Sequence, residues 1–98
     1  MYMLDADHNI IPTESIKEWG EWFETADRIV GRDRLFGTTV STVFVGLDQA
    51  YPRNEESPTC FETMVWGPDG SENVYRCKTW TEAIEQHKKA VKEAETKT

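Results

Sequence analysis

The segment from residue 28 to residue 77 constrains the fold most, because it is rich in β-branched and aromatic residues and is interrupted by turn residues. Its first part, "RIVGRDRLFGTTVSTVFVGLD", predicts strands near 28–33 and 39–47, joined by a turn that ends around Gly37.

The second part of this segment, "CFETMVWGPDGSENVYRCK", predicts a β-hairpin whose turn is formed by "PDG". A bulge at Gly70 would place the two thiols, Cys60 and Cys77, on opposite faces of the hairpin. A plain two-residue turn would instead set the thiols opposite each other. The bulged register predicts three pairs of opposite residues: Phe61 with Cys77, Glu62 with Arg76, and Met64 with Val74.

The stretch "IPTESIKEWGEWFETAD" predicts a first helix that follows Pro12. Thr13 or Ser15 is the expected N-cap, and Glu18 stands where a capping box that starts at Ser15 needs it. Residues at helical spacing are expected to face the core: Ile16, Trp19, Phe23 and Ala26.

A second helix is predicted at the end of the sequence, where Thr79 and Glu82 form another capping box. Its expected apolar stripe consists of Trp80, Ile84, His87, Val91 and Ala94. With a short opening strand at residues 1–4, the order is β-α-β-β-β-β-α. This order predicts a single α+β domain, residues 1–98, with an antiparallel sheet of four to five strands and two helices packed mainly on one face.

The net charge of −7 and the lack of a long apolar run exclude several classes of function. A chain this acidic is not expected to bind nucleic acid directly or to associate with anionic membranes. Two cysteines outside any Cys-x-x-Cys pair, and a start without a signal-peptide pattern, favour a cytoplasmic protein.

The cluster "DADHN" at residues 5–9 raises the possibility of a metal site. Asp5, Asp7 and Asn9 have the spacing of the first ligands of an EF-hand loop. Ile10 and Ile16 occupy the positions of the required glycine and glutamate, so we interpret the cluster as a turn between strand and helix.

His87 is the best candidate for a chemical role, although a packed and hydrogen-bonded core histidine is the simpler interpretation. Asp48 and Glu62 are the partners that the expected topology could bring to it. The sequence has no nucleophile elbow and no phosphate-binding glycine loop. We therefore assign no catalytic residue, metal or cofactor, and an enzyme is the less favoured of the alternatives.

Glu14, Glu18 and Glu21 follow the spacing i, i+4, i+7 and define an acidic strip along the first helix. Such a strip is usually a solvated helix face, and the functional alternative is a docking surface for a basic partner. Trp22 lies off the apolar stripe and is a candidate exposed anchor.

The stretch "DQAYPRNEESPT" at 48–59 lacks periodicity and predicts a long loop. It contains Tyr51 and Arg53, residue types that are enriched where protein interfaces gain most of their affinity. A plain solvent-exposed connection is the structural alternative to a binding loop.

Four segments carry a resemblance to a known family: "EWGEWFETADRIV" (18–30), "VSTVFVGLD" (40–48), "FETMVWG" (61–67) and "TWTEAIEQHKKAV" (79–91). The chain resembles a family of small proteins of tailed bacteriophages and bacterial prophages, which has no established activity. Members often carry a histidine after "GLD". Gln49 at that position here argues against a transition-metal site shared with His87.

The resemblance implies a phage origin and expression in the bacterial cytoplasm. Together with the residues above, it favours a small accessory protein that binds a host or phage protein and so modulates host metabolism or defence. Two other hypotheses stay open: a metal-dependent or hydrolytic domain centred on His87, and a self-assembling structural protein of the virion that associates through a sheet edge.

Overall fold

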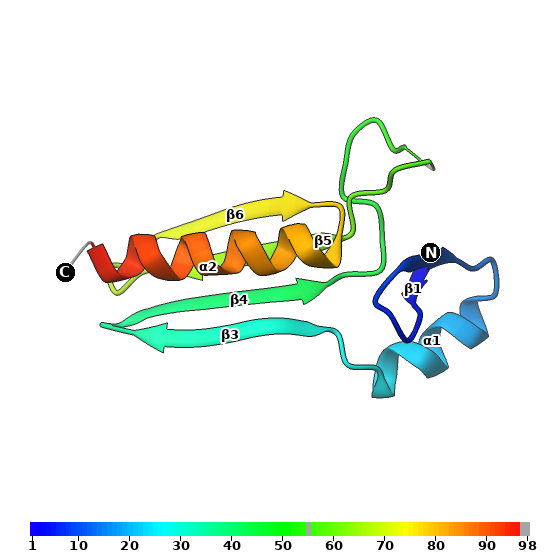
Figure 1. Ribbon diagram of the computed structural model, residues 1–98, viewed down its shortest axis with the longest axis horizontal. Coiled ribbons are helices and arrows are strands. Elements are labelled where there is room, and N and C mark those ends of the chain that lie inside the picture. Colours follow the sequence, from blue (N-terminus) through cyan, green and yellow to red (C-terminus); the bar gives the residue numbers. More distant parts are fainter. Residues whose placement is uncertain (55, 97–98) are drawn as a thin grey trace.

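The computed structural model describes residues 1–54 and 56–96 and confirms the α+β class and the order β-α-β-β-β-β-α (Figure 1). One short strand is added before the first helix. The elements are β1 (Tyr2–Leu4), β2 (Ile10–Pro12), α1 (Ile16–Thr25), β3 (Ile29–Leu35), β4 (Thr38–Phe44), β5 (Phe61–Trp66), β6 (Glu72–Cys77) and α2 (Trp80–Thr96).

The strands form two antiparallel sheets, a two-stranded one of β1 and β2 and a four-stranded one in the order β3-β4-β5-β6. The predicted turn at residues 5–9 exists, but it joins β1 to β2 instead of joining a strand to the helix. The turn forms because the Asp5 carboxylate accepts hydrogen bonds from the backbone N–H groups of Asp7 and Asn9, both at 2.9 Å.

The register of the second hairpin is the predicted one, and Gly70 adopts a φ of +83° in its turn. Both cysteines are free, as that register requires. The cross-strand pairs include Phe61 with Cys77, Glu62 with Arg76, and Met64 with Val74.

The turn between β3 and β4 consists of Phe36 and Gly37, whose φ angles are 52° and 80°. Positive φ at both central residues is the geometry of a type I′ hairpin turn. Gly37 adopts it without strain, whereas a phenylalanine rarely does. Phe36 is nevertheless there, and 66% of its surface is exposed.

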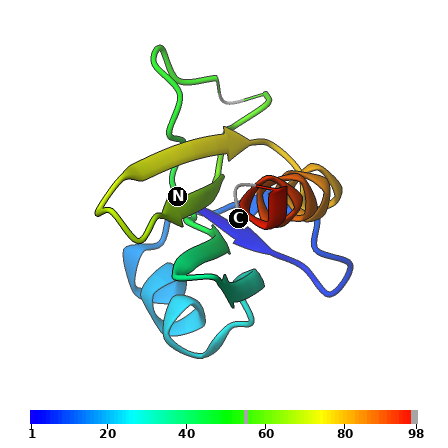
Figure 2. The same cartoon turned by 90° about the vertical axis from the view of Figure 1, so that its left-hand side faces the viewer.

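The helix α2 packs on one face of the four-stranded sheet (Figures 1 and 2). Its start carries the predicted capping box, because the Glu82 carboxylate accepts from the Thr79 N–H and the Thr79 hydroxyl accepts from the Glu82 N–H, each at 3.1 Å. His87 and Ala94 of the predicted stripe are buried, whereas Ala83 and Ala90 are buried in place of the neighbouring Ile84 and Val91. The buried stripe consists of Ala83, His87, Ala90 and Ala94, whose small side chains allow close approach to the strands.

The helix α1 does not lie along that face: its backbone comes close to β1, and its Trp22 side chain reaches Phe44 at the end of β4. Ser15 caps it, as predicted, and its hydroxyl accepts from the Glu18 N–H at 3.2 Å. The prediction that Ile16 faces the core is wrong, because 76% of its surface is exposed.

The hydrophobic core lies where the end of the sheet, the start of α2 and the N-terminal hairpin meet. Trp22 packs against this core, and its ring meets Phe44 edge-on with centroids 5.8 Å apart. The hypothesis of Trp22 as an exposed anchor is therefore wrong. The buried members of the core are Leu4, Phe44, Cys60, Phe61 and Ala83.

Candidate functional site

The connection between β4 and β5, which we call the β4–β5 loop (residues 45–60), is organised by the Asp48 carboxylate. One carboxylate oxygen accepts hydrogen bonds from the N–H groups of Ala50 at 3.0 Å and Thr59 at 2.9 Å. The other accepts from the Asn54 N–H at 2.8 Å. One side chain thus ties together three points of the loop that are distant in sequence.

These contacts set the charge state of Asp48. Desolvation of the carboxylate acts to raise its pKa, but the N–H donors, led by that of Thr59, outweigh this effect. The pKa of Asp48 is therefore lowered from its ordinary value of 3.8. The group is ionised at neutral pH and accepts strong, charge-assisted hydrogen bonds.

Backbone hydrogen bonds close the base of the loop. The Val45 N–H donates to the Cys60 carbonyl, and the Gln49 N–H donates to the Thr59 carbonyl, each at 2.7 Å. Nearer the tip, the side-chain oxygen of Asn54 accepts from the Glu56 N–H at 3.1 Å. The described parts of the loop, residues 45–54 and 56–60, are therefore tied to one another and to the end of the sheet.

Tyr51 and Arg53, the two predicted contact residues of this loop, are both exposed. The relative exposure of Tyr51 is 101%, so nothing within the described chain covers its ring. Figures 1 and 2 show the loop projecting away from the sheet and from α2. The structure thus presents an aromatic ring and a guanidinium to solvent on a fixed support.

The acidic strip lies elsewhere on the molecule. Glu14, Glu18 and Glu21 are all exposed, although Glu14 precedes the N-cap and only the other two belong to α1. In both views, α1 and the β4–β5 loop lie on opposite sides of the N-terminal hairpin (Figures 1 and 2). The two predicted partner-binding regions are therefore separate surfaces.

His87 is buried and hydrogen-bonded, as predicted, but its partners are not the predicted ones. Its Nε2 lies 2.6 Å from Asp33 Oδ2, and its Nδ1 lies 2.7 Å from the Thr42 hydroxyl. Asp48 belongs to the β4–β5 loop, and Glu62 accepts from Arg76 Nε at 3.4 Å. The structure does not bring either of these carboxylates to His87.

A carboxylate, an imidazole and a hydroxyl in line are the residue types of a nucleophilic triad. Here the hydroxyl belongs to Thr42, which has no exposed surface and lies 2.7 Å from the Thr63 hydroxyl. No substrate carbonyl can reach Thr42 Oγ1 in this packing. The chain of polar contacts therefore serves to satisfy polar groups beneath α2.

Asp33 was missed by sequence reasoning because it stands in a strand among charged neighbours. The signal that could have revealed it is Gly31, two residues earlier on the same face of β3. A Cβ at Gly31 would lie 2.7 Å from His87 Nε2, so this glycine makes room for the imidazole. A glycine and an acid two residues apart on a strand are consistent with a side chain packed over that strand.

Potential metal ligands and the two thiols are the remaining groups that could carry chemistry. No cluster of three potential metal-ligating side chains occurs in residues 1–54 and 56–96. Burial, with a smaller contribution from Asp48, raises the pKa of Cys60 to about 12, and burial with Glu82 raises that of Cys77 to about 11. Both thiols are protonated at neutral pH and are poor nucleophiles.

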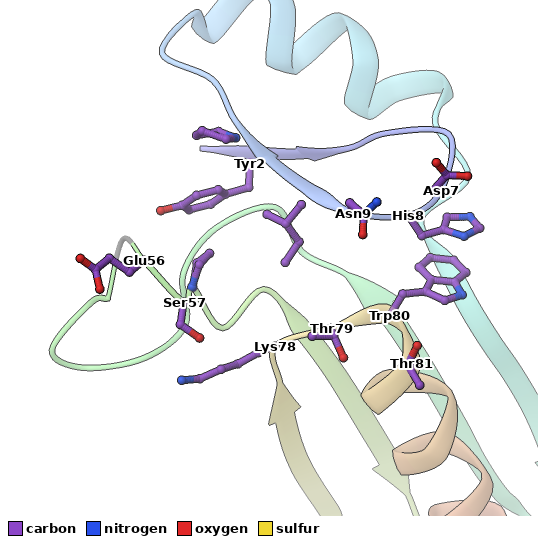
Figure 3. Close-up of a pocket in the computed structure, with 13 residues that line it drawn as sticks. Tyr2, Asp7, His8, Asn9, Glu56, Ser57, Lys78, Thr79, Trp80 and Thr81 are labelled. Atoms are coloured by element: carbon purple, nitrogen blue, oxygen red, sulfur yellow. The ribbon is translucent and has the colours of Figure 1, made fainter.

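A pocket of about 490 Å³ lies between the β1–β2 turn, residues 56–58 and the start of α2 (Figure 3). The rings of His8 and Trp80 stack at one end, with centroids 3.7 Å apart. Lys78 extends along the pocket wall, which also carries the acids Asp7 and Glu56. Charges of both signs line this pocket, so its electrostatics do not select one class of ligand.

None of the described helices has the length and apolar composition needed to cross a membrane. Comparisons of the chain with protein-family models, with curated proteins and with solved structures find no match.

Proposed function

We propose that this chain is a phage-encoded accessory protein that binds a host or phage protein in the bacterial cytoplasm through its β4–β5 loop. The observation that carries the proposal is the fully exposed Tyr51 ring on a loop that Asp48 holds in place. Modulation of host metabolism or defence would follow from occlusion of the partner's surface.

The order of the loop supports this role because binding then requires little loss of conformational entropy. Tyrosine is well suited to such a contact, since it offers a large rigid ring with few rotatable bonds and a polar tip. Arg53, two residues further, adds a planar donor that can pair with a carboxylate of the partner.

The acidic strip contributes to the proposed function in a different way. Because α1 lies on the other side of the hairpin, Glu18 and Glu21 cannot easily share one flat contact with Tyr51 (Figures 1 and 2). Their charge would instead favour encounter with a basic partner over distances of about a Debye length. Replacing them with lysine is expected to slow association more than it changes dissociation.

The experiment is an affinity capture from bacterial lysate with the wild-type chain and a Tyr51→Ala, Arg53→Ala variant. The matched control is Phe36→Asn, which removes an exposed aromatic residue from the turn at the far end of the sheet. We expect one protein to be enriched by the wild type and by the control and to be lost with the loop variant. Equal enrichment by all three chains would refute the loop as the binding site.

A further inference from the structure

The four-stranded sheet has one face without a covering element among the described residues. α2 packs on the other face, where Thr42 and Thr63 contact His87 and Gln86. α1 lies beside β1 and reaches the sheet through Trp22, which meets Phe44 on the same side of β4 as Thr42. Side chains alternate along each strand, so the neighbours of Thr42 and Thr63 point away from α2. We call this surface the open face.

Three rows of cross-strand neighbours run over the open face, and the one farthest from the hairpin turns consists of Val43, Glu62 and Arg76, with Ile29 paired to Val43. The row nearer the hairpin turns consists of Arg34, Thr39, Trp66 and Glu72, one residue from each strand. The next row consists of Arg32, Ser41, Met64 and Val74.

Apolar and aromatic side chains are exposed on this face. The exposed fraction of Trp66 is 38% and that of Val74 is 40%. Adjacent apolar exposure of this kind, flanked by charged residues, is typical of an association surface.

The size of the residues varies regularly across the two rows nearer the hairpin turns, whereas in the third row Glu62 and Arg76 pair with each other within the chain. In both rows, β4 contributes a small polar residue and β5 a large one: Thr39 lies next to Trp66, and Ser41 next to Met64. At the edges, β3 contributes a cation and β6 an anion in the same row, Arg34 and Glu72. These two residues are separated by three strand spacings, about 14 Å, so they do not pair within one chain.

From this pattern we infer that a second copy of the chain docks on the open face, related by a twofold axis that lies in the interface parallel to the strands. This axis places β3 of one copy over β6 of the other, and β4 over β5. Arg34 then faces Glu72 of the partner subunit, and Trp66 faces Thr39 of the partner subunit. Large residues meet small ones in both rows, and the cation and the anion at the ends of the row nearer the hairpin turns pair twice across the interface.

The other in-plane axis, perpendicular to the strands, is disfavoured by charge. It would place β3 over β3 and bring Arg32 near its own copy. Like charges facing each other across an interface oppose association. Both axes leave the strands of the two sheets nearly aligned, as in the roughly 30° packing of twisted sheets, so the charges decide between them.

The open face is small, and this sets the expected affinity. Four strands at about 4.8 Å spacing and six residues at about 3.4 Å give a contact of roughly 19 by 20 Å. A contact of this size belongs to the weak or transient class of interfaces. We therefore expect a dimer with a dissociation constant in the micromolar range.

The test is sedimentation velocity of the full chain from about 1 µM to about 1 mM, a range that brackets micromolar dissociation constants. Arg34→Glu and Glu72→Arg are measured separately and as an equimolar mixture. Each variant alone places two like-charge pairs in the dimer and should weaken self-association at least about tenfold. In the mixture, the glutamate introduced at position 34 of one chain faces the arginine introduced at position 72 of the other, and the unchanged Glu72 and Arg34 face each other. A heterodimer should therefore form.

Arg53→Glu and Glu21→Arg serve as controls, because they make the same changes in net charge away from the open face and should leave self-association intact. Circular dichroism and thermal melting verify that all variants fold. A wild-type chain that stays monomeric overturns the inference and leaves the open face to a different partner. Single variants that dimerise like the wild type, or a mixture that stays monomeric, also overturn it.

Discussion

At the scale of single residues, Asp48 and His87 show how polar side chains determine local structure in this protein. The Asp48 carboxylate accepts hydrogen bonds from backbone N–H groups of the β4–β5 loop, which have no partner strand there. His87 of α2 contacts Asp33 of β3 and Thr42 of β4, and so connects the three elements. The sequence predicts that His87 is buried and bonded. It cannot identify Asp33 as the partner, because that contact spans 54 residues and depends on how α2 lies over the sheet.

The lowered pKa of Asp48 predicts a pH dependence for the stability of the loop. Since the folded pKa lies below the ordinary value of 3.8, the ionised carboxylate stabilises the folded chain fully above that value. The stabilisation is lost as the pH falls through the lowered pKa. Asp48→Asn should cost about 1 to 2 kcal/mol of unfolding free energy at pH 7.

The measurement is urea unfolding of the wild type and of Asp48→Asn between pH 7 and acid. We expect the difference in unfolding free energy to shrink only in the acid range. Glu56→Gln, an exposed acid of the same loop, is the control. A difference that does not depend on pH would rule out the proposed role of the ionised carboxylate.

At the scale of secondary-structure elements, the sequence predicts local features well and relative placement poorly. The capping residues Ser15 and Thr79 and the register of the β5–β6 hairpin are correct, because they depend on residues close in sequence. The strand β2 was missed because it ends at Pro12, and a proline before a helical pattern indicates a helix boundary. The position of α1 beside β1 was not predictable, because both ends of a sheet offer apolar surface.

The capping box of α2 gives a prediction at this scale. Thr79→Ala removes the hydroxyl that accepts from the Glu82 N–H and should lower the unfolding free energy by about 1 kcal/mol. Thr81→Ala, an exposed position in the first turn, should have a smaller effect. Chemical denaturation of both variants provides the comparison, and equal losses would mean that the cap does not stabilise α2.

At the scale of the whole molecule, three surfaces are separate from one another: the β4–β5 loop, the acidic strip on α1 and the open face of the sheet. The net charge of −7 is therefore not spread evenly, since Arg32 and Arg34 lie on β3 while the acidic strip lies on α1. Because the surfaces are separate, the proposed contact of the loop with a partner and the proposed self-association through the sheet would not compete.

The rates at which the two thiols are alkylated measure how readily the molecule opens: Cys60 requires unfolding of the whole domain, and Cys77 requires only local opening. Cys60 has no exposed surface and its pKa is raised to about 12, so alkylation at pH 8 should require unfolding of the whole domain. Cys77 is partly exposed at the end of β6 and should react faster, though more slowly than in denaturant. Mass spectrometry of labelled peptides over time distinguishes the two. Equal rates in the native chain would contradict the described packing.

The closure of the β4–β5 loop at its base has a consequence for how such a protein can evolve. Because Val45 and Gln49 are bonded to Cys60 and Thr59, the strands hold their register whatever lies between these bonds. Doubling the length of a flexible loop costs only about 0.6 kcal/mol. Residues 51–53, which lie between the Asp48 hydrogen bonds to Ala50 and Asn54, can therefore be exchanged or extended with little effect on the sheet, and the fold can present a new contact surface by replacing one short segment.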